Sequence, residues 1–170
     1  MREAHLDRVS GKLVSEFAIR QPPPALTALR AGLFLLNDDF HNSHSCSQSI
    51  EGLGEDRTGD YWHAILHRRE PDYGNAKYWF RHVGRHPVYP NLARAVDRHL
   101  NGEFGSPTPK LERWKSRLTT NSGWDPFAFV DLCEEAESDA QLRHWCERVQ
   151  YEEMLLLLES SARDAIGSPL

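Results

Sequence analysis

Residues 58–84 read TGDYWHAILHRREPDYGNAKYWFRHVG, and this stretch predicts two helices joined by a tight turn. The first helix begins near Thr58 and ends at Glu70, because a proline disfavours the helical conformation in the residue before it. Asp72 is a good N-cap for the second helix, and Gly84 supplies its end. Apolar residues recur at helical spacing within the second helix, at Ala76, Trp79, Phe80 and Val83.

The flanking sequence is helical in its periodicity as well. A long helix is expected from about Pro24 toward Ile50. Three leucines define its inward face, at Leu26, Leu29 and Leu33. Further helices are expected at residues 91–100, around 111–118, from 125, and from 138 to about 166. No segment alternates convincingly as a β-strand does, so the predicted fold class is all-α.

The composition fits one domain. The chain has 170 residues, of which 39% are hydrophobic, and this is enough for one core of ordinary size. We therefore predict a single compact, helical-bundle-like domain of about six to eight helices over residues 1–170, with residues 1–21 as a peripheral N-terminal segment. No run reaches the roughly 18 apolar residues that a membrane span needs, so no membrane contact is expected.

The cysteines indicate a reducing compartment. Cys46, Cys133 and Cys146 are odd in number and form no Cys-x-x-Cys pair, so free thiols are the plainest interpretation. The first residues lack the apolar stretch of a secretory signal. We expect a cytoplasmic protein.

The charge is unevenly distributed although the net charge is only −5. Residues 61–100 hold seven Lys and Arg against three acids, and residues 129–170 hold ten acids against three Arg. A basic, histidine-rich middle suits an anionic small molecule. The alternative is that the two regions attract each other within the fold. No nucleic acid is expected as a partner, because the whole chain is acidic and no basic run is long.

The clearest candidate site lies on the helix predicted at residues 58–70. His63, His67 and Glu70 are spaced four and three apart, so they project from one side of that helix. Two imidazoles and a carboxylate in this arrangement can hold one divalent transition metal. Without a metal, the same trio can act as an acid and base set. A structural trio of hydrogen-bonded side chains would have the same spacing.

Two more candidates come from the end of the helix expected at residues 24–50. Steps of three or four residues from Leu33 lead to His44 and Gln48, so an apolar face changes into imidazole and amide. We predict that His44 joins the site as a metal ligand or catalytic residue, and that Gln48 binds substrate. A solvated helix end is the alternative.

Other polar residues extend the predicted site. Arg68, Lys77 and Arg81 are candidates for holding a negative group of the substrate, with Asn75 as a hydrogen-bonding neighbour. The alternative is that these cations pair with the acidic helices. Glu153 precedes a run of leucines, where a lone carboxylate is costly unless it is paired or metal-bound, and it is a further candidate metal ligand.

Residues 41–92 also resemble a family of bacterial and fungal proteins. The shared pattern has the form SH-x-x-SQ, then WHAI-x-HRREPD-x-x-NAKYWF-x-x-VG-x-HP. The matching segments are 43–48, 62–72, 75–80 and 83–87. This family has no established activity, so the resemblance implies a shared site built from three helices and names no reaction.

We therefore expect an enzyme that acts on a small anionic metabolite through a His and Glu site, with or without one divalent metal. Isomerase, lyase and hydrolase chemistry are not separated by these residues. The chain has no Walker loop, GxGxxG, GxSxG or HExxH motif, so ATP hydrolysis, dinucleotide-dependent hydride transfer and the common serine-hydrolase plan lack support. The alternatives are a non-catalytic ligand- or metal-binding module and a helical protein-interaction domain with an acidic docking helix.

Overall fold

The computed structural model describes residues 23–100, 109–120 and 123–167, and this part of the chain confirms the all-α fold. The described helices are α2 (Pro24–Leu36), α3 (Phe40–Ser49), α4 (Thr58–Arg69), α5 (Tyr73–Val83), α6 (Tyr89–Arg98), α7 (Pro109–Leu118), α8 (Pro126–Glu135) and α9 (Ala140–Gly167). One small hairpin joins α7 to α8, with strands β1 (Thr119–Thr120) and β2 (Gly123–Trp124). The expected peripheral segment at residues 1–21 lies outside the described residues.

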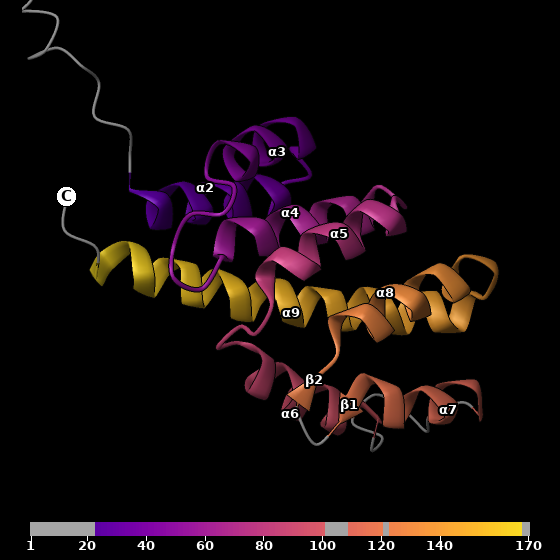
Figure 1. Cartoon of the computed structure of the whole chain (residues 1–170). Coiled ribbons are helices and arrows are strands. Elements are labelled where there is room, and N and C mark those ends of the chain that lie inside the picture. The colour runs from indigo at the N-terminus through magenta and orange to yellow at the C-terminus, as the bar shows by residue number, and fades with distance from the viewer. Residues whose placement is uncertain (1–22, 101–108, 121–122, 168–170) are drawn as a thin grey trace, which may run out of the picture.

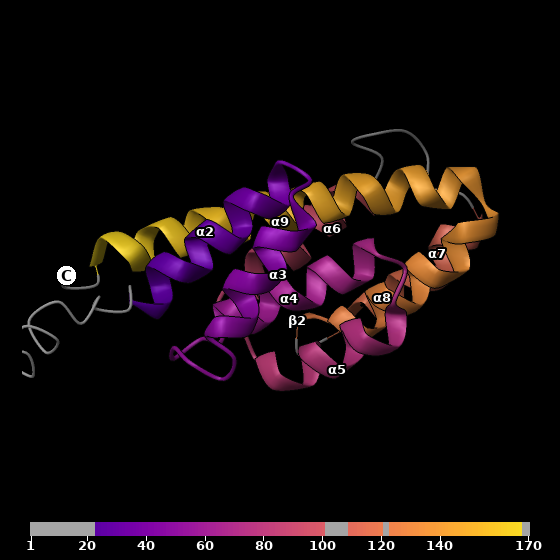
Figure 2. The ribbon, with the colours of Figure 1, turned by 90° about the horizontal axis from the view of Figure 1, so that it is seen from above.

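The long helix α9 organises the molecule. Figure 1 shows it running between two groups of elements, with α2 to α5 on one side and α6, α7 and the hairpin on the other. Seen from above, α2 lies along the C-terminal half of α9 (Figure 2). None of the described helices is long and apolar enough to cross a membrane.

The helix α4 is the most deeply buried element, with every residue from 59 to 68 inside. Tyr61, Trp62 and Ile65 are fully inaccessible to solvent. Trp62 also donates a hydrogen bond from its indole Nε1 to the Ser161 hydroxyl of α9, at 3.0 Å. Because α4 is enclosed on all sides, polar residues on it need partners inside the protein.

The helix expected from Pro24 toward Ile50 is broken, and that prediction is wrong. The chain turns at residues 37–39, where Asp38 adopts a positive φ of 59°. Asp39 then caps a new helix, because its side chain accepts a hydrogen bond from the Asn42 N–H at 3.1 Å. Short aspartate side chains tolerate the left-handed conformation and cap helices well, so the break has a local cause.

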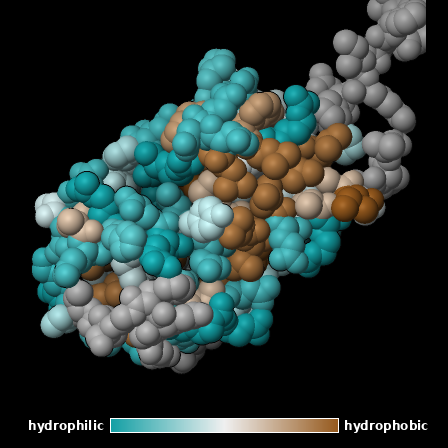
Figure 3. Space-filling view, turned by 180° about the vertical axis from the view of Figure 1, so that it is seen from behind, coloured by the Kyte–Doolittle hydropathy of each residue, from teal (hydrophilic) through white to brown (hydrophobic). Residues whose placement is uncertain are grey.

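The inward face of α2 also differs from the predicted one. Leu33 is 46% exposed, and the buried face carries small residues instead, including Ala28, Ala31 and Gly32. A Cβ atom on Gly32 would lie 2.5 Å from the Trp62 ring, so the small face lets α2 approach α4 closely. Leu33 therefore lies at the surface, whereas Leu35 of the same helix is fully buried. Figure 3 shows apolar side chains gathered on the back of the molecule.

The helix ends that turn the chain around α4 are largely those predicted. Asp72 caps α5 by accepting a hydrogen bond from the Asn75 N–H, and Gly84 ends this helix with a φ of 65°. Asp125 caps α8, with Pro126 in the first turn. The last helix was expected from residue 138 but begins at Ala140, and Asp139 caps it by accepting hydrogen bonds from the Gln141 and Leu142 N–H groups.

Candidate metal centre

Two helices bring three histidines together. His63 and His67 lie one turn apart on α4, and His44 reaches them from α3. The ring centroid of His44 is 4.5 Å from that of His63 and 5.6 Å from that of His67. One ligand atom from each residue can be chosen so that all lie within 4.8 Å of one another. The sequence-based expectation that His44 lies beside the α4 histidines is met, although α3 is a separate helix.

The rings have a definite arrangement. His63 and His67 stack with centroids 4.8 Å apart and an interplanar angle of 21°. His44 meets both edge-on, at 83° and 86°. On the other side, the Trp79 indole stacks on His63 at 3.9 Å. Sequence reasoning assigned Trp79 to the core of its helix and missed this stacking contact, which fixes the plane of the His63 imidazole.

His63 is the most unusual residue of the group. Its side chain is fully buried, and neither ring nitrogen has a hydrogen-bond partner among the described residues. Burial lowers the pKa of His63 to about 3, with smaller contributions from His67 and His44. The imidazole is therefore neutral at physiological pH and keeps a free lone pair. Buried polar atoms are normally paired, so an unpaired imidazole beside two others fits a metal ligand.

His67 has partners on both ring nitrogens. The Asn75 side-chain amide lies 3.1 Å from Nε2, and a Glu70 carboxylate oxygen lies 3.2 Å from Nδ1, a contact at ion-pair distance that is not aligned as a hydrogen bond. Burial lowers the pKa of His67, and the Glu70 carboxylate opposes that shift. Glu70 itself is 43% exposed and lies outside the three-histidine group. Glu70 lies beside His67, where a carboxylate would orient the imidazole if that ring held a metal.

Two buried hydroxyls accompany His44 on α3. Ser43 and Ser47 are both fully inaccessible to solvent, and neither hydroxyl oxygen has a hydrogen-bond partner in the described part of the chain. They are four residues apart and therefore lie on one face of the helix. Both belong to the segment SHSCSQ, but the sequence analysis followed the helix face of His44 and Gln48 and assigned no role to either serine.

The predicted substrate cations do not gather at the histidines. Arg68 is buried and forms an ion pair with Glu153 of α9, and its Nε donates to the Gln150 side chain at 3.0 Å. The second oxygen of Glu153 accepts a 2.7 Å hydrogen bond from the Tyr61 hydroxyl. Both carboxylate oxygens of Glu153 therefore have partners, which explains how this residue can be buried. Glu153 is thus part of an ion pair and is not the metal ligand that was predicted.

The remaining candidates are also dispersed. Lys77 pairs with Asp131 of α8, and Gln48 is exposed and donates to Glu51. Arg81 is exposed on α5. Of the predicted substrate-binding residues, Asn75 is the one that contacts a histidine of the group. The alternative interpretation of the cations, pairing with acidic helices, therefore describes Arg68 and Lys77.

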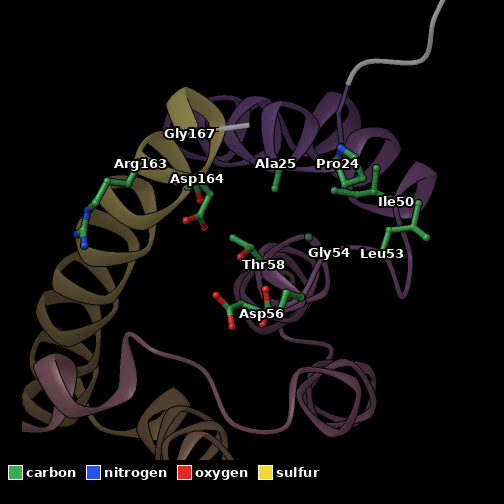
Figure 4. A pocket seen from close by; sticks show the side chains of 14 residues that line it. Pro24, Ala25, Ile50, Leu53, Gly54, Asp56, Thr58, Arg163, Asp164 and Gly167 are labelled. Atoms are coloured by element: carbon green, nitrogen blue, oxygen red, sulfur yellow. The ribbon is translucent and has the colours of Figure 1, made fainter. Parts of the chain in front are cut away.

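Two cavities lie elsewhere in the molecule. One of about 470 Å³ is enclosed by the start of α2, the loop before α4 and the end of α9, as Figure 4 shows. Asp56 and Asp164 line it, and burial together with the Asp56 carboxylate raises the pKa of Asp164. The other, of about 620 Å³, lies beside α8 and α9. Neither is lined by a histidine of the group.

No protein-family model, curated protein or solved structure matches the chain. The chemistry of the centre is therefore argued from its own residues.

Proposed function

We propose that the protein binds one divalent transition metal through His44, His63 and His67, and that this centre acts on a small molecule. The observation that carries the proposal is the state of His63, which is buried, neutral and without a hydrogen-bond partner among the described residues. Leaving such a group unpaired costs about 1–3 kcal/mol. A metal bound to its lone pair would supply the missing interaction.

The ligand set favours particular metals. Imidazole nitrogens suit zinc, copper, iron and nickel, whereas magnesium and calcium prefer oxygen ligands. Three protein ligands leave one position of a tetrahedral ion open, as in catalytic zinc sites. A metal bound there supplies a Lewis acid and lowers the pKa of a bound water.

The neighbouring residues would support this chemistry. Asn75 lies beside Nε2 of His67 and Glu70 lies beside Nδ1. A metal bound to one of these nitrogens would displace the partner of that nitrogen, and the other partner would then hold the orientation of the ring. Glu70 is also partly exposed, so its carboxylate can exchange a proton with solvent or substrate at the edge of the centre. These contacts favour hydrolytic or proton-transfer chemistry and do not separate hydrolase, lyase and isomerase reactions.

The substrate that we propose is anionic, and one of the predicted cations is left to bind its negative group. Arg68 and Lys77 are engaged by Glu153 and Asp131, so Arg81 is the predicted cation that stays exposed. We expect phosphorylated sugars, hydroxy acids or keto acids to raise the melting temperature of the protein, and Arg81→Gln to weaken that shift. Arg85→Gln is the matched control, because Arg85 is exposed just past the end of the same helix. Equal shifts in all three proteins would count against an anion held at Arg81.

A non-catalytic metal-binding module is the second candidate function. It is favoured by the two cavities described above, since neither is lined by His44, His63 or His67. Such a module would bind the metal with the same ligands but would give no turnover with any member of the substrate panel.

The experiment that tests the metal centre is elemental analysis of protein without a histidine tag, purified and then titrated with Zn²⁺, Co²⁺ and Ni²⁺. We expect one metal per chain in the parent, and loss of it in His63→Ala and His67→Ala with the helical circular-dichroism signal kept. His41→Ala is the control, because His41 lies on α3 but is exposed and outside the three-histidine group. A parent that takes up no metal, or a His63→Ala variant that keeps it, would contradict the proposal.

A further inference from the structure

Two free cysteines meet between α8 and α9. Cys133 lies on α8 and is partly exposed, whereas Cys146 lies on α9 and is 5% exposed. The two helices are packed against each other, and both residues line the same cavity of about 620 Å³. The two thiols lie close enough to influence each other's protonation. The metal centre uses neither of them.

The surroundings of the pair favour a reactive thiol. Arg68 lines the same cavity, and its Nη1 has no hydrogen-bond partner among the described residues although the residue is only 3% exposed. The hydrogen bond from Cys146, together with the Arg68 guanidinium, lowers the pKa of Cys133 despite burial. The same hydrogen bond and burial raise the pKa of Cys146. Cys133 is the more exposed of the two thiols and lines the cavity together with Arg68, so it is the thiol that we expect to react first.

We propose that Cys133 and Cys146 form an oxidation site at which a hydroperoxide converts the two thiols into a disulfide between α8 and α9. The cavity gives a small oxidant access to Cys133, and Cys146 lines the same cavity from the helix packed against α8. The pair is thus arranged as a peroxide-reactive cysteine with a resolving partner.

The chemistry balances in two steps. The Cys133 thiolate attacks one oxygen of hydrogen peroxide, the O–O bond breaks, and the departing hydroxide takes a proton to give water and a Cys133 sulfenic acid. The Cys146 sulfur then attacks the Cys133 sulfur, the S–O bond breaks, and the thiol proton leaves with the hydroxide as a second water. The protein loses two protons and two electrons, which together are two hydrogen atoms, and the peroxide is reduced to two water molecules.

Cys46 is the internal control. It lies on α3, is partly buried, and does not line the cavity that Cys133 and Cys146 share with Arg68. It should therefore react more slowly than Cys133 with the same oxidant, although both side chains are partly accessible.

The test is treatment of the full chain with hydrogen peroxide in the presence of a chelator, followed by intact mass measurement and peptide mapping. We expect the loss of two hydrogen atoms, a crosslinked peptide joining α8 to α9, and recovery of the original mass with dithiothreitol. Cys46→Ser should form the same crosslink. Cys146→Ser should stop at a sulfenic acid on Cys133 that dimedone traps.

Two results would overturn the proposal. The first is a parent protein whose peptide map, under conditions in which its circular-dichroism signal is intact, contains no link between Cys133 and Cys146. The second is oxidation of Cys46 at the same rate as Cys133. Both are measured on the folded parent protein, so neither depends on how well a serine variant folds.

Discussion

The buried ion pair between α4 and α9 gives the most quantitative prediction about the fold. Glu153 is fully buried, its two oxygens are taken by Arg68 and Tyr61, and the Arg68 side chain is 1% exposed. The Arg68 guanidinium also lies over the Phe129 ring, with its central carbon 4.5 Å from the ring centroid. Removing the carboxylate therefore leaves a buried cation whose remaining side-chain hydrogen bond is the one to Gln150.

We expect Glu153→Leu to lower the free energy of unfolding by about 3–5 kcal/mol, the typical cost of breaking a buried pair from one side. Urea unfolding, followed by the helical circular-dichroism signal at about 222 nm, measures this loss of free energy directly. With a slope of about 2 kcal/mol per molar urea, the midpoint should fall by roughly 2 M. Adding Arg68→Met should recover most of the loss, because both charges are then gone.

The control lies on the same helix. Glu159 forms an exposed pair with Arg163 four residues later, so Glu159→Gln should change stability by only about 0.3–0.5 kcal/mol. If Glu153→Leu costs no more than Glu159→Gln, or if the double variant is less stable than Glu153→Leu alone, the account of a desolvated and mutually dependent pair is refuted.

Three further predictions concern packing and pH. Gly32→Ala should lower the free energy of unfolding in urea by about 1–3 kcal/mol, because the new methyl group would lie 2.5 Å from the Trp62 ring. An unchanged unfolding midpoint would contradict the close approach of α2 to α4. Trp79→Ala should lower the free energy of unfolding by about 3–5 kcal/mol, as expected for a buried aromatic ring that stacks on His63. A loss below about 1 kcal/mol, which is typical of a surface substitution, would contradict its burial. Burial lowers the pKa of His86 to about 4, so as the pH falls the unfolded chain binds a proton before the folded protein does. The free energy of unfolding should therefore fall between about pH 6.5 and pH 4, with a loss of about 2 kcal/mol at pH 5. His86→Asn should remove this part of the pH dependence.

Local signals in the sequence predict much of the fold. The turn at Pro71, the cap at Asp72 and the end at Gly84 are set by residues next to each other in the chain, and the structure has α4 and α5 where they were expected. The proline after Asp125 places the start of α8 in the same way. Such signals work because a cap or a proline acts on its own backbone.

The faces of α2 were predicted less well, for a physical reason. Leucines normally mark the inward side of a helix, but Leu33 is 46% exposed, and the residue that faces the bulky Trp62 of α4 is its neighbour Gly32. Which face is buried is decided by the shape of the partner helix, and that is not encoded in the periodicity of α2 itself. The break at Asp38 was missed because the leucine pattern before it seemed to continue through polar residues.

The candidate site was likewise predicted only as far as helical spacing allows. The spacing of His63 and His67 placed both rings on one side of α4, and His44 was expected beside them. The orientation of those rings depends on residues from other helices, such as Trp79 of α5, which stacks on His63. Spacing along one helix does not predict such a contact. Likewise, the burial of Arg68 follows from its contact with Glu153, which lies 85 residues along the chain.

The central claim is that three histidines hold a metal, and X-ray absorption at the zinc edge of zinc-loaded protein tests it most directly. The account predicts imidazole nitrogens at about 2.0–2.1 Å, with the outer-shell scattering of three imidazole rings, and loss of this signature in His63→Ala. Sulfur ligands at about 2.3 Å would instead place the zinc on cysteine thiols, and a shell made only of oxygen atoms would place it on surface carboxylates or water. Either result would contradict a metal centre at His44, His63 and His67.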